Sequence, residues 1–281
     1  MSPSHTEAWL SRSLWLLASS AVALLLLIFL FLINESRLAV VDGHWLRFFD
    51  SSGWFPSAGQ FNLWPMLLAT VLATVGALAL AVPMGLAAAL FVNFFAPAPL
   101  ATTFRRLLML LAGIPSVVYG LWGLTVLVPL ITRVAPPGAS LLAAMLILAV
   151  MILPTVALTS EAALRTVPVN YWRGGQALGL SEQAILLKIA LPAARTGIVA
   201  GVLLATTRAL GETMAVLMVA GNVVQVPGSI FDSVRVLTAN IALEMAYATD
   251  AHRASLYVSS LMLTLVVVAI VLLGQRLEAK Q

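Results

Sequence analysis

The sequence predicts an all-α integral membrane protein with six transmembrane helices. Apolar residues make up 61% of the 281 positions and charged residues only 9%, against roughly 45–50% and 25% in soluble domains. The mean hydropathy is +1.03. Too few polar residues remain to cover a soluble core, so a water-soluble globular fold is excluded.

The apolar runs give the expected spans. A helix needs about 20 apolar residues to cross the bilayer. Six stretches meet that requirement: 13–33, 64–93, 107–132, 140–160, 196–221 and 255–274. The first stretch is either a cleaved signal peptide or a retained anchor. From Leu14 to Ile33 only Ser19 and Ser20 interrupt the apolar run, which exceeds a signal-peptide core of about 7–15 residues, so we interpret it as a retained span.

Basic residues favour a cytoplasmic location for both termini. With that orientation, 9 lysines and arginines lie on the cytoplasmic side and 5 on the other, in the direction of the positive-inside rule. Two outer segments, about 34–63 and 222–254, are long enough for a partner to contact. The long inner segment, about 161–195, is either a solvated connector or a set of short helices at the membrane surface.

Arg208 and Glu212 form a charged pair inside the fifth predicted span. Arg208 is expected close to the bilayer midplane, where a charge costs about 2.5–3.5 kcal/mol on insertion scales. The i, i+4 spacing puts both side chains on one helical face. The pair either holds two helices together or forms a polar site on a substrate path. An apolar pair would be cheaper for helix contact, which favours the substrate path.

The chemistry of this pair suits an oxyanion. The planar fork of Arg208 can donate two parallel hydrogen bonds to a tetrahedral anion. Glu212 either holds the guanidinium in place or accepts a hydrogen bond from the protonated oxygen of hydrogenphosphate. On the same helix, Gly197, Gly201 and Gly211 predict close helix packing rather than ligand contact.

The third predicted span contains a helix-breaking segment, Gly113 to Gly120, with Pro115 near its start. Proline frees a carbonyl inside a helix, and such backbone is tolerated at membrane depth only inside protein or along a cavity. Ser116 and Tyr119 are therefore candidate donors to an anion, the alternative being a kink that serves packing. Pro83 and Pro154 are weaker signals of the same kind.

Several catalytic and cofactor sites are absent from the sequence. There is no cysteine, and the three histidines (His5, His44 and His252) are far apart, which argues against a metal site. No G-x-x-x-x-G-K-[ST] loop occurs, nor a nucleophile or zinc motif. We therefore expect no enzymatic activity and no cofactor in this chain, with ATP and Mg²⁺ on a separate ATPase if transport is ATP-driven.

The inner segment carries a specific pattern. Gly179 is followed, after nine residues, by Ile189, and then by Leu191 and Pro192. This G-x9-I-x-L-P arrangement resembles half of the coupling motif, E-A-A-x3-G-x9-I-x-L-P, of bacterial binding-protein-dependent ABC permeases. The resemblance implies a type I ABC importer permease fold and contact with an ATPase.

The other half of that motif differs. Arg173, Gly174 and Gly175 stand where the family has Glu-Ala-Ala. Each glycine costs about 1 kcal/mol in a helix relative to alanine. Because arginine inverts the expected charge, we predict an acidic or rearranged pocket on the ATPase. A literal Glu161-Ala162-Ala163 has the wrong spacing to Gly179.

A closer resemblance is to the PstC-type permease subunits of phosphate-specific ABC transporters. It is carried by the segments 111–120, 152–155, 208–216 and 237–245, within a likeness that covers about residues 64–275. It implies a permease domain at 64–275, preceded by a stub, first span and periplasmic segment (1–63) and followed by a cytoplasmic tail (276–281). Arg208 and Glu212 match the family's charged pair.

The resemblance also implies partners and a location. The expected partners are a PstA-type permease subunit, an ATPase dimer, a periplasmic phosphate-binding protein and inorganic phosphate, in the bacterial cytoplasmic (inner) membrane. The alternatives are a permease for another oxyanion (phosphonate, tungstate or molybdate), a phosphate-signalling scaffold without transport, and an ion channel. The spacing of the coupling motif argues against the channel.

Overall fold

The computed structural model describes residues 5–40, 47–50 and 53–279. His44 and Lys280, which contributed to the sequence argument, lie outside the described residues. The helices are α1 (His5–Val40), α2 (Arg47–Asp50), α3 (Trp64–Leu90), α4 (Ala98–Gly113), α5 (Ser116–Trp122), α6 (Val128–Thr132), α7 (Leu141–Arg165), α8 (Val169–Ala177), α9 (Glu182–Ile185), α10 (Leu191–Gly211), α11 (Met214–Val219), α12 (Leu237–Glu244) and α13 (Asp250–Ala279). A two-stranded antiparallel hairpin, β1 (Trp54–Phe55) and β2 (Gln60–Phe61), is the sheet in the described chain.

Five of the predicted spans appear as long apolar helices. Within the described residues these are Trp9–Arg37, Trp64–Phe95, Leu141–Arg165, Glu182–Gly211 and Asp250–Arg276. The described chain therefore has five helices long and apolar enough to cross a membrane, or six if the bent pair formed by α4 and the segment Ser116–Thr132 counts as one span. The all-α membrane fold is confirmed.

The third predicted span, 107–132, is wrong as a single helix. Helix α4 begins earlier, at Ala98, and the chain bends by 93° before Ser116. Ile114 and Pro115 both have extended backbone (ψ 129° and 141°). For Ile114 the reason is that a proline disfavours the helical conformation of the residue before it. Pro83 and Pro154, by contrast, lie inside α3 and α7, which continue through them.

Helix α7 is the centre of the bundle. It packs against α3, α4 and α10, and Ile147, Met151 and Ile152 are fully buried there. On α3, a buried alanine recurs every fourth residue from Ala69 to Ala81, which keeps one narrow face free of large side chains. The small residues let α3 and α7 approach closely.

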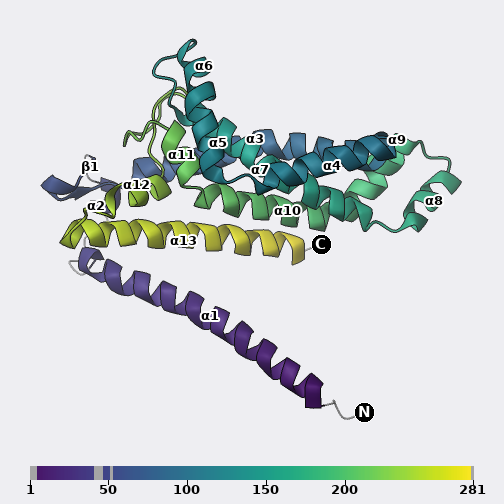
Figure 1. Ribbon diagram of the computed structural model, residues 1–281, viewed down its shortest axis with the longest axis horizontal. Helices are drawn as coiled ribbons and strands as arrows, with labels where there is room; N and C mark the ends of the chain where they lie inside the picture. The colour runs from purple at the N-terminus through teal and green to yellow at the C-terminus, as the bar shows by residue number, and fades with distance from the viewer. Residues whose placement is uncertain (1–4, 41–46, 51–52, 280–281) are drawn as a thin grey trace.

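Helix α1 lies outside this bundle (Figure 1). It packs along α13 and diverges from it toward its N-terminal end. Phe31 makes an edge-to-face contact with Tyr257 at 5.6 Å between ring centroids. None of the most apolar window of α1 is buried within the chain, so this helix leaves an apolar surface for lipid or a partner.

The predicted inner and outer segments lie at opposite ends of the long axis of the molecule. In Figure 1 the N-terminal end of α1 and the C-terminal end of α13 both point toward the end that carries α8. The hairpin and α12 lie at the opposite end. The predicted inner segment 161–195 is largely helical: α7 continues to Arg165, and helix resumes at Glu182 without a break into α10.

Two of the three glycines of the fifth span allow close helix packing. A Cβ on Gly197 would lie 2.6 Å from the Ala163 Cβ, and one on Gly201 would lie 2.0 Å from the Thr159 hydroxyl. Both neighbours belong to α7, so the packing prediction is confirmed for these positions. It is wrong for Gly211, where a Cβ would meet nothing within 4 Å.

This difference predicts the effect of adding one methyl group. Gly201→Ala pushes α10 away from α7, because the Cβ of Thr159 would also be only 2.7 Å away. We expect a loss of about 1–3 kcal/mol, typical of overpacking, seen as a lower thermal unfolding midpoint in detergent. Gly211→Ala is the matched control, and equal midpoints for the two variants would contradict the packing.

Candidate functional site

The fifth predicted span is broken beside the charged pair. Helix α10 ends at Gly211, Glu212 has extended backbone (φ −69°, ψ 128°), and α11 begins at Met214. Arg208 therefore lies in the last turn of α10 and Glu212 beyond it. The expectation that both share one face of a continuous helix is wrong, and no ion pair joins them within the described residues.

Glu212 satisfies the backbone of the break. One carboxylate oxygen, Oε1, accepts a hydrogen bond from the Ala215 N–H (3.1 Å), which is one of the amides that the start of α11 leaves without a helical partner. The Glu212 carbonyl accepts from the Thr238 hydroxyl (2.8 Å). In this arrangement Glu212 acts as a cap of α11.

Glu212 also lines a small cavity. The cavity measures about 10 Å³ and its polar lining consists of Glu212 and the hydroxyls of Thr70, Thr74 and Thr238. This is room for about one water molecule, and it is too small for a tetrahedral oxyanion. Arg208 is not among the residues that line it.

Arg208 has most of its hydrogen-bonding capacity free. The side chain is half-buried, and its one hydrogen bond to the described chain runs from Nη1 to the Thr155 hydroxyl at a long 3.4 Å. A guanidinium has five N–H donors. The remaining donors are available to an anion. Thr155 belongs to segment 152–155, one of the segments that carry the resemblance to PstC-type permeases.

Tyr119 and Ala209, the residue after Arg208, belong to one buried cluster, but the Tyr119 hydroxyl is engaged. The Tyr119 hydroxyl donates to the Leu111 carbonyl across the bend (2.8 Å), so this proton is already used. Ser116, one turn earlier on α5, makes no side-chain hydrogen bond to the described part of the chain and keeps a free hydroxyl.

The bend and the break pack on each other. A Cβ on Gly120 would lie 2.9 Å from the Ala215 Cα, so only glycine allows α5 to approach α11 at this point. Helices α5 and α11 thus meet beside α7, and Arg208 lies in the last turn of α10, which also packs on α7 and ends just before α11. This junction is the candidate site of the molecule.

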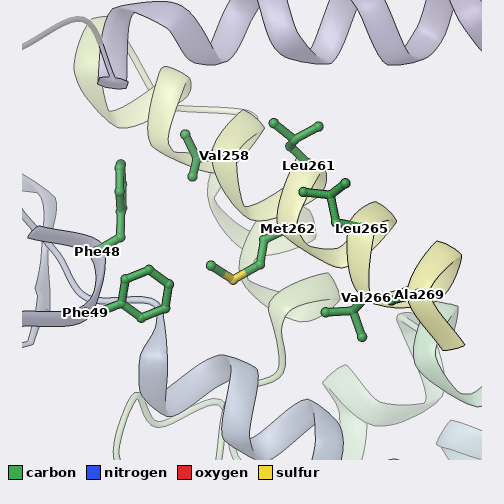
Figure 2. Close-up of a pocket in the computed structure, with 8 residues that line it drawn as sticks. All are labelled: Phe48, Phe49, Val258, Leu261, Met262, Leu265, Val266 and Ala269. Carbon is green, nitrogen blue, oxygen red and sulfur yellow. The ribbon is translucent and has the colours of Figure 1, made fainter. Parts of the chain in front are cut away.

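A larger apolar groove elsewhere does not suit an anion. Figure 2 shows Phe48 and Phe49 facing Met262 and its aliphatic neighbours along α13. The groove has a volume of about 400 Å³ and its lining is almost entirely apolar. Because it presents no donor or charge, it offers an oxyanion nothing to replace its hydration.

The predicted coupling residues form a helix–turn–helix that includes α8 and α9. Arg173, Gly174 and Gly175 lie on α8, and Arg173 and Gly174 are exposed. Gly175 is buried, and a Cβ there would lie 2.7 Å from Ile185 Cγ1 and 3.3 Å from Ile189 Cδ1. The turn depends on Gly179, which has a left-handed φ of +73°.

The rest of the pattern connects this turn to α10. Ser181 caps α9 by accepting from the Ala184 N–H, and a π-turn, Leu186–Ala190, precedes Leu191 and Pro192 at the start of α10. A proline removes one helical hydrogen bond and crowds the preceding turn, so the wider π-turn accommodates Pro192. On α8, Trp172 makes a tilted ring contact with Phe94 (ring centroids 5.1 Å apart), which ties this helix to the π-helical turn Phe91–Phe95 that follows α3.

Two buried carboxylates were missed by the sequence analysis as interaction centres. Glu161 accepts from Arg105 Nε (2.7 Å) and lies 3.7 Å from Arg165 Nη1, which joins α4 to α7. Its i, i+4 spacing to Arg165 was an available signal. Glu244 binds Arg235 and His252, and only the short spacings among these three residues hinted at this.

Comparisons with known proteins agree with this architecture. The family described as "Binding-protein-dependent transport system inner membrane component" matches residues 81–280. A probable ABC transporter permease protein, YqgH, of Bacillus subtilis is 38% identical over 73% of this chain and 67% of its own length. A phosphate transport system permease protein, PstC, of Mesorhizobium japonicum is 32% identical over 86% of this chain and 80% of its own length.

Solved structures show the same fold. An alginate ABC importer matches with a TM-score of 0.63 at 13% identity, over 97% of this chain and 98% of the other. The methionine transporter MetNI matches with a TM-score of 0.60 at 20% identity, over 78% and 93% of the two chains. The chain is therefore a multi-pass permease subunit of an ABC importer rather than an enzyme, and it belongs to the family of inner-membrane components of binding-protein-dependent transport systems.

Proposed function

We propose that this chain conducts inorganic phosphate across the cytoplasmic membrane by alternating access. The observation that carries the proposal is Arg208, a half-buried guanidinium beside the break between α10 and α11, with one long hydrogen bond to the described chain. A preorganised arginine with free donors suits a tetrahedral oxyanion. PstC relatives at about 30% identity over most of the chain support phosphate as that anion.

The remaining partners follow from this assignment. A PstA-type subunit completes the path, a periplasmic phosphate-binding protein delivers the substrate, and an ATPase dimer binds ATP and Mg²⁺. The N-terminal end of α1, the C-terminal end of α13 and α8 lie toward one end of the molecule (Figure 1), and the basic residues favour that end as the cytoplasmic one. We assign the hairpin and the segment 222–254 to the periplasmic side.

The roles of the site residues are divided. Arg208 contacts the substrate, and Ser116 supplies a second donor from the start of α5. Tyr119 and Glu212 hold the bend and the break through the Leu111 carbonyl and the Ala215 N–H. This assignment makes Glu212 a positioning residue, in preference to an acceptor for the proton of hydrogenphosphate.

Substitutions at the pair test this division. Arg208→Ala is expected to reduce ATP-dependent phosphate uptake into proteoliposomes by about 10- to 100-fold, the effect of losing a charged hydrogen bond. Glu212→Gln retains an amide oxygen that can cap α11, so uptake stays near wild type, whereas Glu212→Ala loses the cap and much of the uptake.

Arg106→Ala serves as the control, because Arg106 is exposed on α4. Normal uptake by an assembled Arg208→Ala complex would refute the role of Arg208. A Glu212→Gln variant that no longer prefers phosphate over sulfate would restore the substrate-contact role of the glutamate. Stimulation of the ATPase by molybdate or phosphonate instead of phosphate would show that the transported anion is not phosphate.

The coupling residues make a separate prediction. Arg173 is exposed on α8 and has no ion pair with the described chain, so its charge is available to the ATPase. Arg173→Glu is expected to lower the ATPase rate of the reconstituted transporter by about tenfold, because like charges then meet at the contact. Arg195→Glu, on the exposed side of α10, is the control, and equal effects of both variants would argue against a contact through Arg173.

A further inference from the structure

The short helix α12 is held at both ends by side-chain hydrogen bonds to distant parts of the chain. Five of its eight residues are buried: Leu237, Thr238, Ala239, Asn240 and Glu244. It belongs to the segment 237–245, one of those that carried the resemblance, and the site described above uses only its Thr238. At a rise of about 1.5 Å per residue, eight residues span about 12 Å.

The outer end of α12 is Glu244, a buried residue with 6% exposure. Its Oε2 accepts from Trp54 Nε1 (2.8 Å) and lies 2.8 Å from His252 Nε2. Its Oε1 accepts from Arg235 Nη1 (2.6 Å). One carboxylate therefore joins the hairpin, the segment before α12 and the start of α13.

Arg235 extends this cluster along α12. The same Nη1 donates to Asn240 Oδ1 (3.0 Å), and Nε donates to the Asn222 carbonyl (2.9 Å). Asn222 follows α11 and has a left-handed φ of 57°. Because buried charges are stable only when paired and hydrogen-bonded, Glu244 and Arg235 fix the outer segments to α12 in one arrangement.

The inner end of α12 contacts the break in the fifth span. The Thr238 hydroxyl donates to the Glu212 carbonyl (2.8 Å), and the Leu237 N–H donates to the Thr70 hydroxyl (3.0 Å). Glu212 is the first residue after α10, four positions beyond Arg208. One short helix thus runs from the outer carboxylate cluster to the backbone beside the proposed substrate contact.

We propose that α12 is a rigid connection between the outer segments and the helix break, with Thr238 and Glu244 as positioning residues for the substrate path. A displacement of the hairpin or of the start of α13 reaches Glu212 through this helix, since its ends are fixed by hydrogen bonds rather than by loose packing. That the coupling serves transport rests on the proposed function. The coupling itself is a property of this chain and can be measured without substrate.

Spin labels give a direct test, because the chain has no cysteine. Met214→Cys places a label on the first residue of α11, where the methionine is 49% exposed, and Met109→Cys places a control label on α4, at 50% exposure. The full-length chain in lipid nanodiscs is compared with and without Glu244→Gln or Thr238→Val.

Each variant is expected to raise the mobile fraction of the Met214→Cys spectrum by about twofold or more, the size of a modest coupling energy. The Met109→Cys spectrum stays unchanged. Because both changes act through one helix, the double variant adds little to the larger single effect. Thr238→Ser keeps the hydroxyl and retains the wild-type spectrum, and Thr264→Val, which removes a hydroxyl bonded only within α13, does so too.

Three outcomes would overturn the connection. They are an unchanged spectrum at position 214 in Thr238→Val, independent and fully additive effects of the two variants, or an equal change at position 109, which would mean general loosening. Phosphate uptake by the unsubstituted chain with its partners tests the proposed function separately, so a failure of one is distinguishable from a failure of the other.

Discussion

At membrane depth every peptide N–H and C=O needs a partner inside the protein, and this constraint decides where the helices can be interrupted. Helical structure is interrupted between α4 and α5 at Ile114–Pro115 and between α10 and α11 at Glu212–Thr213. Near the first interruption the Leu111 carbonyl accepts a hydrogen bond from the Tyr119 hydroxyl. At the second, the Glu212 carboxylate and carbonyl are bonded to Ala215 and Thr238. Side chains from the neighbouring turn or from α12 thus replace the missing helical bonds.

The same constraint explains why both interruptions lie together against α7. An interrupted helix is tolerated only where protein surrounds it, and α7 is the most deeply buried of the five long apolar helices in the described chain. Glycine at 120 lets α5 reach α11, and glycine at 123 avoids Ile147 of α7 and Val219 of α11. Close backbone contact therefore supports both interruptions.

Much of this architecture could be predicted from the sequence. Apolar runs located five long helices because the length needed to cross a bilayer is a strong physical requirement. The glycines at 197 and 201 indicated close packing correctly, because small residues one turn apart have few other uses in such helices. The break after Gly211 was missed, since Glu212 and Thr213 carry no proline and the partner that stabilises the break, Thr238, lies 26 residues away.

Other contacts between residues far apart in the sequence could not be predicted either. Trp54 and Glu244 are 190 positions apart, and no periodicity links them. Arg105 and Glu161 are 56 positions apart, so only the i, i+4 partner Arg165 was within reach of a helical pattern. The spacing of residues along the sequence predicts helices and their faces. The donors that bind a buried carboxylate are set by the folded arrangement, which that spacing does not reveal.

The separation of Arg208 from Glu212 changes the electrostatic meaning of the site. A closed pair would be neutral, and an approaching anion would have to compete with the carboxylate for the guanidinium. With Glu212 committed to the α11 backbone, the positive charge of Arg208 is matched by no carboxylate of the described chain. Half-burial strengthens its attraction for an anion relative to water, and the neutral hydroxyl of Thr155 orients it without cancelling the charge. Under the proposed function, Glu212 therefore contributes to transport in two ways. It leaves the charge of Arg208 unpaired within the described chain, and it stabilises the break between α10 and α11 beside that arginine.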